Sequence, residues 1–242
     1  MDSSRLVAHR GYPLRYPENT LVGIEAALRL GAMHVEVDVQ LTADREPVLF
    51  HDRDLKRVCG VSGAVHERKL AELLELHAYD PGSFRDEFRG VHPATLVEFR
   101  SLLGRFPEAD ALVEVKRISV ESFGVETVVE TILGHLEPVA NRCTVISFAP
   151  EVLNEARRRG HEKLGLVLPD WSRGVLAQAD ALDVDLVLCN VRKLPWTGDL
   201  RREGQRLAVY DVVDPRRVEK WFGRGADLVE TFAIGEMLER FR

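Results

Sequence analysis

The sequence predicts an α/β protein whose parallel strands close into a (β/α)8 TIM barrel. From residue 95 onward, short apolar runs rich in β-branched residues alternate with helical patterns, and the connections between them are short. Such alternation favours parallel strands joined by right-handed crossovers. The 242 residues are close to the roughly 250 that such a barrel needs. We count nine strand candidates for eight places, so one of them is misread or lies outside the barrel.

The first strand and the first helix are separated by a segment rich in turn residues. Arg5 to Ala8 is predicted to be a short strand that delivers His9 to Gly11 to its C-terminal end. Pro13 and Pro17 then exclude regular structure. A helix is expected between Asn19 and Gly31, because apolar residues there recur at helical spacing. Asn19 or Thr20 can cap its start, and Gly31 suits its end.

The stretch Val35 to Asp52 carries the first unusual polar residues. Side chains of a strand alternate between its two faces, so Glu36 and Asp38 share one face and the valines between them share the other. Unpaired buried carboxylates are costly, so they need a cation, strong hydrogen-bond donors or protonation to be tolerated. A second apolar run ends at His51 without a helix before it, and whether the two runs pair directly stays open.

Residues 53–93 are charge-dense and punctuated by glycine and proline. One helix, Glu67 to Leu76, is expected within this segment. A long irregular insertion after a strand, here the one ending at His51, is usually a functional loop or a lid. The alternative is a solvated excursion without a role. We therefore expect one domain, 1–242, with a cap-like insertion at about 53–93.

The remaining elements alternate in order. Helices are expected at 95–103, 121–136, 151–159, 172–182 and 215–222, and strands at 111–116, 143–147, 163–168, 185–190, 205–210 and 226–231.

The composition excludes several classes of protein. The net charge of −6 and the lack of a basic block argue against nucleic acid as a partner. No apolar run is long enough for a transmembrane segment, and the first run is too short for a signal-peptide core, so we expect a soluble cytoplasmic protein. The cysteines Cys59, Cys143 and Cys189 are scattered, as expected for reduced thiols, and receive no role.

Four expected strand ends carry polar residues together, and active sites of such barrels lie at these ends. These residues are His9 and Arg10, Glu36 and Asp38, His51 and Asp52, and Glu114 and Lys116. Three converging carboxylates without a cysteine suit Mg²⁺ or Ca²⁺ better than zinc. Two histidines beside such a metal suggest an acid and a base. Singly, each residue is better explained as a hydrogen-bonded strand end or a surface ion pair. Taken together, they favour a site.

Five motifs in order resemble the glycerophosphodiester phosphodiesterases. They are AHRG from Ala8, PENT from Pro17, the E-x-D of Glu36 and Asp38, the HD of His51 and Asp52, and the E-x-K of Glu114 and Lys116. The resemblance continues through Ser147 and Phe148 and covers most of the chain.

This resemblance implies a TIM barrel with a small inserted segment after the HD motif. It implies a divalent metal ion held by Glu36, Asp38 and Glu114, with His9 and His51 as acid-base residues. It places Arg10 and Lys116 near the phosphate, and Phe148 and Tyr210 with the substrate.

The C-terminal third departs from the family pattern. Tyr210 stands where the family commonly has a tryptophan, and Phe232 follows Thr231 where the family has an acid. These differences concern the shape of the pocket, and hence the substrate alcohol, more than the chemistry.

The leading hypothesis is metal-dependent hydrolysis of a small glycerophosphodiester to glycerol 3-phosphate and an alcohol. One alternative is a lysophospholipase D that uses the same residues on lysophospholipids, with leucines of the insertion lining an apolar groove. An alternative of another class is a non-catalytic barrel that binds a phosphate ligand. The sequence leaves open the physiological metal, the preferred alcohol, which histidine is acid and which is base, and the oligomeric state. It also leaves open whether water attacks phosphorus directly or the glycerol hydroxyl of the substrate attacks first to give a cyclic phosphate.

Overall fold

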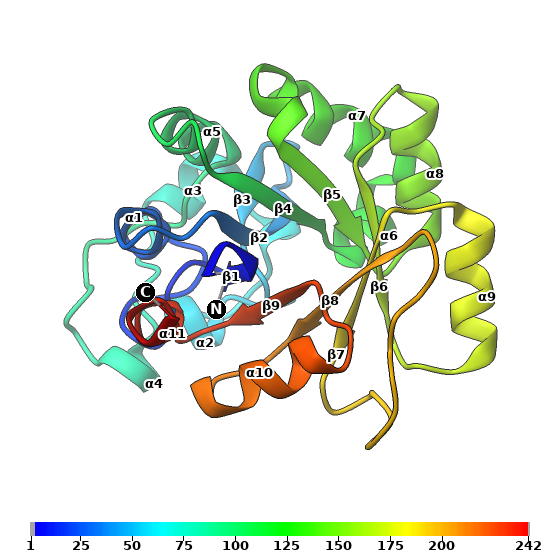
Figure 1. Cartoon of the computed structure of the whole chain (residues 1–242). Coiled ribbons are helices and arrows are strands. Elements are labelled where there is room, and N and C mark those ends of the chain that lie inside the picture. Colours follow the sequence, from blue (N-terminus) through cyan, green and yellow to red (C-terminus); the bar gives the residue numbers. More distant parts are fainter. Residues whose placement is uncertain (1–2, 242) are drawn as a thin grey trace.

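In the computed structural model, which describes residues 3–241, eight parallel strands close into a barrel with helices around its outside (Figure 1). Closure follows from β1, which pairs in parallel with β2 on one side and with β9 on the other. The barrel strands are β1 Leu6–His9, β2 His34–Leu41, β4 Asp110–Val115, β5 Cys143–Ser147, β6 Leu164–Leu168, β7 Leu186–Asn190, β8 Arg206–Tyr210 and β9 Leu228–Thr231. The predicted fold is confirmed.

The ninth strand candidate lies outside the barrel. Strand β3, Pro47–Leu49, pairs with β2 in the antiparallel direction. The turn between them is too short for a crossover, which needs about a dozen residues or more, so the chain can only fold back on itself. Beyond β3 the amide of Phe50 donates to the carbonyl of Asp38 at 2.9 Å. The two apolar runs therefore pair directly, and His51 reaches the barrel mouth by a hairpin instead of standing at the end of a barrel strand.

The helices between strands largely match the apolar patterns. They are α1 Leu21–Arg29, α5 Leu96–Gly104, α6 Arg117–Phe123, α7 Val125–Leu136, α8 Pro150–Arg158, α9 Arg173–Leu182 and α10 Pro215–Gly223, with the 3-10 turns η1 Ser3–Arg5 and η3 Glu137–Arg142. The Thr20 side chain caps α1, and Thr95 caps α5 in a reciprocal arrangement with Glu98. Helix α11, Ile234–Phe241, which the sequence analysis did not identify, packs beside β1 (Figure 1).

Two predicted helices differ from the structure. The helix expected at 121–136 is two helices, α6 and α7, because Gly124 between them has φ 80° and ψ 150°, far from helical values. The helix expected at Glu67 to Leu76 is shorter and is preceded by a separate 3-10 turn. The insertion contains α2 Lys56–Cys59, η2 Val65–Glu67, α3 Leu70–Leu74 and α4 Pro81–Phe84.

The core has three parts. Outward-facing strand residues pack against the surrounding helices. Inward-facing residues fill the barrel, and these are Val7, Leu112, Ile146, Val167, Leu186, Leu188, Ala208 and Leu228. The insertion forms a small core of its own around Leu55, Val58 and Leu73, together with Val48 of β3. Its extent as a cap-like segment of a domain 1–242 stays a prediction, and residues 1, 2 and 242 lie outside those described. Within residues 3–241, no helix combines the length and the apolar character that crossing a membrane requires.

Candidate active site

Two adjoining hollows lie at the C-terminal ends of the barrel strands. The first, called the inner cavity, has a volume of about 100 Å³. It is lined by His9, Arg10, Glu36, His51, Glu114, Lys116, Ile146, Phe148, Val167, Leu188, Tyr210 and Glu230. The second, called the outer groove, has a volume of about 520 Å³. It is lined by His51, Asp52, Arg53, Asp54, Glu114, Lys116, Arg117, Ile118, Glu121 and Phe148.

Three carboxylates converge on one side of the inner cavity. Glu36 and Asp38 stand on β2, and Asp38 lies level with Glu114 on the neighbouring strand β4. Each of the three offers an oxygen within 4.8 Å of those of the other two. The Oε1 atom of Glu36 is buried and has no hydrogen-bond partner. Oxygen ligands in such a cluster are those that Mg²⁺ and Ca²⁺ prefer, so these residues fit a divalent metal ion.

Two cations stand against the carboxylates. The Nζ of Lys116 lies 3.0 Å from Oδ1 of Asp38 and 2.8 Å from Oε1 of Glu114, and the Nε of Arg10 lies 3.2 Å from Oδ2 of Asp38. Asn19 adds a donor, since its Nδ2 donates to Oδ2 of Asp38 at 2.9 Å. Burial alone would raise the pKa of Asp38, but Lys116 and Arg10 outweigh it and hold that pKa well below its usual range.

Glu36 and Glu114 behave differently from Asp38. Burial, with repulsion from Asp38, raises the pKa of Glu36 well above its ordinary value. Burial also raises the pKa of Glu114, although Lys116 opposes the shift. A carboxyl group whose pKa is raised by burial is stabilised in its charged form when a cation binds beside it. The electrostatics of the cluster therefore also fit a metal site.

His9 lies deep in the inner cavity. Its Nε2 is 3.7 Å from Oε2 of Glu36, and its Nδ1 is 3.5 Å from Oδ1 of Asp211. Its ring stacks on Phe232 with 4.6 Å between centroids. Burial, reinforced by the charge of Arg10, lowers the pKa of His9 well below its ordinary value. The ring is therefore neutral near pH 7 and can accept a proton.

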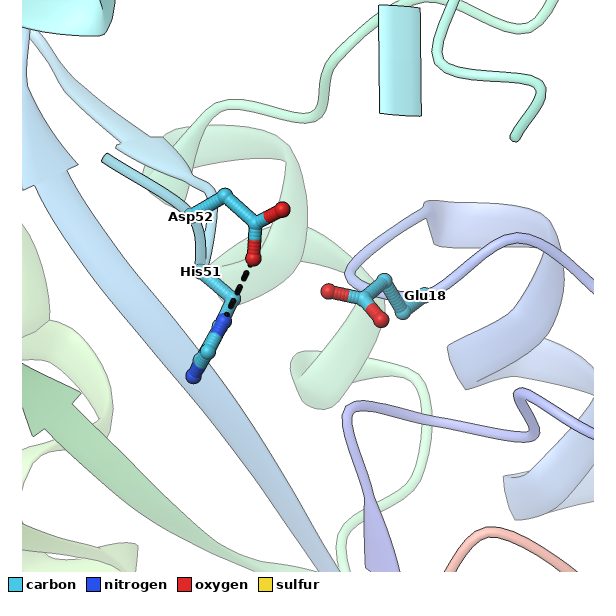
Figure 2. A group of neighbouring side chains, drawn as sticks. All are labelled: Glu18, His51 and Asp52. Carbon is cyan, nitrogen blue, oxygen red and sulfur yellow. Dashed lines mark hydrogen bonds and ion pairs between the residues drawn. The ribbon is translucent and has the colours of Figure 1, made fainter. Parts of the chain in front are cut away.

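His51 is oriented by charged neighbours. Its Nδ1 lies 2.8 Å from Oδ1 of Asp52, and the Nε of Arg57 donates to Oδ2 of Asp52 at 2.7 Å. Arg57 also donates to both oxygens of Glu18, which comes from the segment before α1. Figure 2 shows His51 hydrogen-bonded to Asp52, with Glu18 facing them. Glu18, His51 and Asp52 also offer atoms within 4.8 Å of one another, but Arg57 and Arg10 already bind their carboxylates.

The structure brings all nine predicted site residues together. Eight of them line the inner cavity, and Asp38 lies directly behind, bonded to Lys116. Phe148 belongs to both hollows, and the ring of Tyr210 meets that of His9 edge-on at 6.0 Å. The roles assigned to these residues stay predictions.

Several residues were missed by sequence reasoning. Glu230 lines the inner cavity from β9 and is only 2% exposed. The rule that identified Glu114, a carboxylate on the inward face near the end of a barrel strand, would also have identified Glu230. Asn19 lies in the PENT motif, to which the sequence analysis gave no role in the site, and it bonds Asp38. Arg57 has no comparable signal, because it lies in the insertion and its pairing with Asp52 depends on how that segment folds.

The chain is similar in sequence to known proteins of one family. Residues 9–231 match the glycerophosphoryl diester phosphodiesterase family. A glycerophosphodiester phosphodiesterase of Caldanaerobacter subterraneus is 30% identical over 224 residues, which cover 84% of this chain and 88% of that protein. One from Bacillus altitudinis is 32% identical over 145 residues, which cover 60% of this chain and 58% of that protein.

Solved structures share the fold. A phosphodiesterase from Oleispira antarctica, in complex with the product sn-glycerol-3-phosphate, superposes with a TM-score of 0.87 at 22% identity, covering 98% of this chain and 96% of that one. A glycerophosphodiester phosphodiesterase from Thermotoga maritima superposes with a TM-score of 0.75 at 22% identity, covering 98% of each chain. Because the family match extends over most of the barrel and its site, the chain belongs to the glycerophosphoryl diester phosphodiesterase family.

Proposed function

We propose that this protein is a metal-dependent phosphodiesterase that hydrolyses glycerophosphodiesters to glycerol 3-phosphate and an alcohol. The observation that carries the proposal is the inner cavity, where three carboxylates, two cations and two histidines meet. The family match and the relatives named glycerophosphodiester phosphodiesterase support the same activity.

Charge balance supports a divalent ion, Mg²⁺ or Ca²⁺, in the cavity. Four carboxylates, of which Glu36, Asp38 and Glu230 are buried and Glu114 is partly buried, stand beside the cations Arg10 and Lys116. When all four are ionised, two negative charges remain, and one divalent cation neutralises them. Glu36, Asp38 and Glu114 would hold the ion, which would supply positive charge to the phosphate and a polarised oxygen.

Arg10 and Lys116 are placed to bind the phosphodiester. A phosphodiester is an anion that repels nucleophiles, so its charge has to be neutralised before attack. Both cations line the inner cavity and are kept charged. Burial alone would lower the pKa of each, but the neighbouring acids, above all Asp38, outweigh it and raise both values.

The two histidines would share the proton transfers. A phosphodiester needs a base for the attacking hydroxyl and an acid for the leaving alkoxide. His9 and His51 line the same cavity and come from different elements. His9 is neutral and can accept a proton, and Asp52 fixes the ring of His51.

The proposal is tested with purified protein on glycerophosphocholine, glycerophosphoethanolamine and glycerophosphoglycerol. Release of glycerol 3-phosphate is measured with Mg²⁺, Ca²⁺ or Mn²⁺ and with a chelator as control. Release that depends on the metal is expected. If no substrate yields glycerol 3-phosphate with any of these ions, the proposal is wrong. Binding of substrate without product would support the non-catalytic alternative.

A lysophospholipase D activity has less support. Of the four leucines that could line an apolar groove, Leu70, Leu73 and Leu76 pack in the insertion's own core. Leu74 is exposed, but neither it nor the other three line the outer groove. The outer groove is lined mostly by charged residues, with Phe148 and Ile118 as its apolar members. Equal rates on a glycerophosphodiester and on its acylated counterpart would favour this alternative. The cytoplasmic location and the absence of a nucleic-acid partner stay predictions.

A further inference from the structure

Glu230 is a buried acid in the inner cavity to which the proposed chemistry gives no role beyond its charge. It stands on β9, level with Val7 of β1, and its side chain joins the lining of the inner cavity. Its Oε1 atom is buried and has no hydrogen-bond partner among the described residues. A buried acceptor without a partner costs about 1–3 kcal/mol, and more when the group is charged. Such an atom is expected to meet a donor that arrives with a ligand.

The position of Glu230 argues against a role as a metal ligand. The carboxylates whose oxygens lie within 4.8 Å of one another in this cavity are Glu36, Asp38 and Glu114, and Glu230 is not among them. It stands on β9, which is separated from β2 by β1. Glu230 therefore lines the cavity outside this set of three carboxylates, although its charge is near enough to help raise the pKa of Glu36.

The two hollows differ in size and in exposure. The inner cavity is lined in part by Ile146, Val167 and Leu188, which are buried and belong to the core inside the barrel. At about 100 Å³ it has the volume of roughly three water molecules at ~30 Å³ each. The outer groove is five times larger and is lined by exposed charged residues such as Arg53 and Arg117.

The hollows meet at His51, Glu114, Lys116 and Phe148, which line both of them. A phosphate bound by Lys116 would therefore lie at the junction, with one ester arm directed into each hollow. A small cavity suits the part of the substrate that does not vary, which is glycerol. An open groove suits alcohols of different sizes.

We propose that Glu230 accepts hydrogen bonds from the glycerol hydroxyls of the substrate, so that glycerol occupies the inner cavity and the variable alcohol occupies the outer groove. This inference rests on the proposed function. It makes Glu230 a specificity-determining residue for the glycerol arm, since glycerol supplies the donors that its carboxylate lacks.

The test compares two phosphate monoesters that differ only in these hydroxyls, sn-glycerol 3-phosphate and n-propyl phosphate. Their affinities for the Mg²⁺-loaded protein are measured by calorimetry. Hydrogen bonds to a charged group contribute about 1.5–3 kcal/mol, so the native protein should prefer glycerol 3-phosphate by on the order of 10- to 100-fold.

Two variants isolate Glu230. Glu230→Leu removes the acceptor, and the preference should fall below about 3-fold while propyl phosphate binds as before. Glu230→Gln keeps the shape and one acceptor but loses the charge, and the preference should be intermediate. Glu162→Gln is a matched control, because Glu162 is an exposed acid just before β6 that lines neither hollow. It should keep the native preference.

Specific results would overturn the inference. A preference that persists in Glu230→Leu, or that is missing in the native protein, contradicts a role in binding glycerol. Equal weakening of both ligands, or a loss of Mg²⁺ binding in Glu230→Gln, assigns Glu230 to the phosphate or to the metal instead. These results differ from failure of the proposed function, in which the native protein releases no glycerol 3-phosphate from any substrate.

Discussion

The Nδ1 atom of His51 lies 2.8 Å from Oδ1 of Asp52, its neighbour in sequence, and Arg57 holds the other oxygen of Asp52 at 2.7 Å. Burial would raise the pKa of Asp52, but the hydrogen bonds from His51 and Arg57 outweigh it and hold that pKa well below its usual range. Asp52 is therefore ionised at neutral pH. It orients the ring and leaves Nε2 of His51 as the nitrogen available to a substrate.

Replacing His51 tests its role directly. His51→Ala should lower kcat by on the order of 10²- to 10⁴-fold, because a positioned acid or base contributes that much. Mg²⁺ affinity, measured by calorimetry, should stay nearly native, since His51 is outside the cluster of Glu36, Asp38 and Glu114. If the variant loses the metal instead, His51 is a ligand.

Replacing Asp52 tests its positioning role. Asp52→Asn keeps the size of the side chain but removes the charge that orients His51, and kcat should fall by about 10- to 100-fold with a smaller change in KM. Asp86→Asn, at an exposed ion pair with Arg89, is the matched control and should behave as the native enzyme. Equal losses in the two variants would contradict the positioning role.

Metal removal should alter the pH dependence of stability. In the metal-free protein the pKa values of Glu36, Glu114 and Glu230 are raised, chiefly by burial. Above pH 4.5 these three glutamates lose their protons in the unfolded chain but keep them in the folded chain. The free energy of unfolding of the metal-free protein should therefore fall as the pH rises from about 5 to 8. Asp38 has a lowered pKa, and its contribution is lost only at more acidic pH.

A bound divalent ion favours the ionised carboxylates, so its stabilising effect should grow with pH. Thermal unfolding with Mg²⁺ and with a chelator, at pH values from 5 to 8, measures this. The increase in Tm caused by Mg²⁺ should be larger at pH 8 than at pH 5. Glu36→Gln, which removes one oxygen of the cluster, should reduce the increase at every pH. A Tm increase that is independent of pH would contradict the expected linkage.

The turn that carries His9 and Arg10 depends on Gly11. Its φ is +88°, and a Cβ there would lie 2.9 Å from the backbone of Gly23 and of Ile24. Gly31 also has a positive φ, +97°, but a Cβ there would meet nothing within 4 Å. Both glycine-to-alanine changes introduce backbone strain of about 1 kcal/mol, and only Gly11→Ala adds a collision.

Chemical unfolding should therefore show a larger loss of stability for Gly11→Ala than for Gly31→Ala. The expected difference is about 1–3 kcal/mol, the range for overpacking. Gly11→Ala should also lower kcat/KM, because the collision displaces the neighbouring Arg10. Equal losses of stability in the two variants would show that the close contact with α1 does not matter.

The local pattern of the chain was enough to predict the barrel and most of its site. Alternation of side chains places Glu36 and Asp38 on one face of a strand, and the same rule places Glu114 and Lys116. The parallel barrel then brings these strand ends together, because the C-terminal ends of parallel strands lie at the same edge. The nine residues predicted from these patterns and from the family resemblance therefore lie in one place.

The differences have local and tertiary causes. The break between α6 and α7 comes from the backbone conformation of Gly124. The sequence did not predict this break, because an isolated glycine within a helical pattern is often tolerated. The direction of β3 depends on its pairing with β2, and periodicity does not report the direction of a strand. His51 therefore reaches the site by a hairpin that its own sequence did not reveal.

The sequence by itself determined which residues face inward on each strand, because that depends only on the two-residue period of an extended chain. Only the tertiary structure decided which of those inward residues meet. Glu230 faces the same cavity as Glu36 because β1 closes the barrel between β9 and β2. Arg57 reaches Asp52 and Glu18 at once because the insertion packs beside the segment before α1. Such contacts join residues far apart in the chain, and their energies depend on burial and distance, which arise only when the barrel closes.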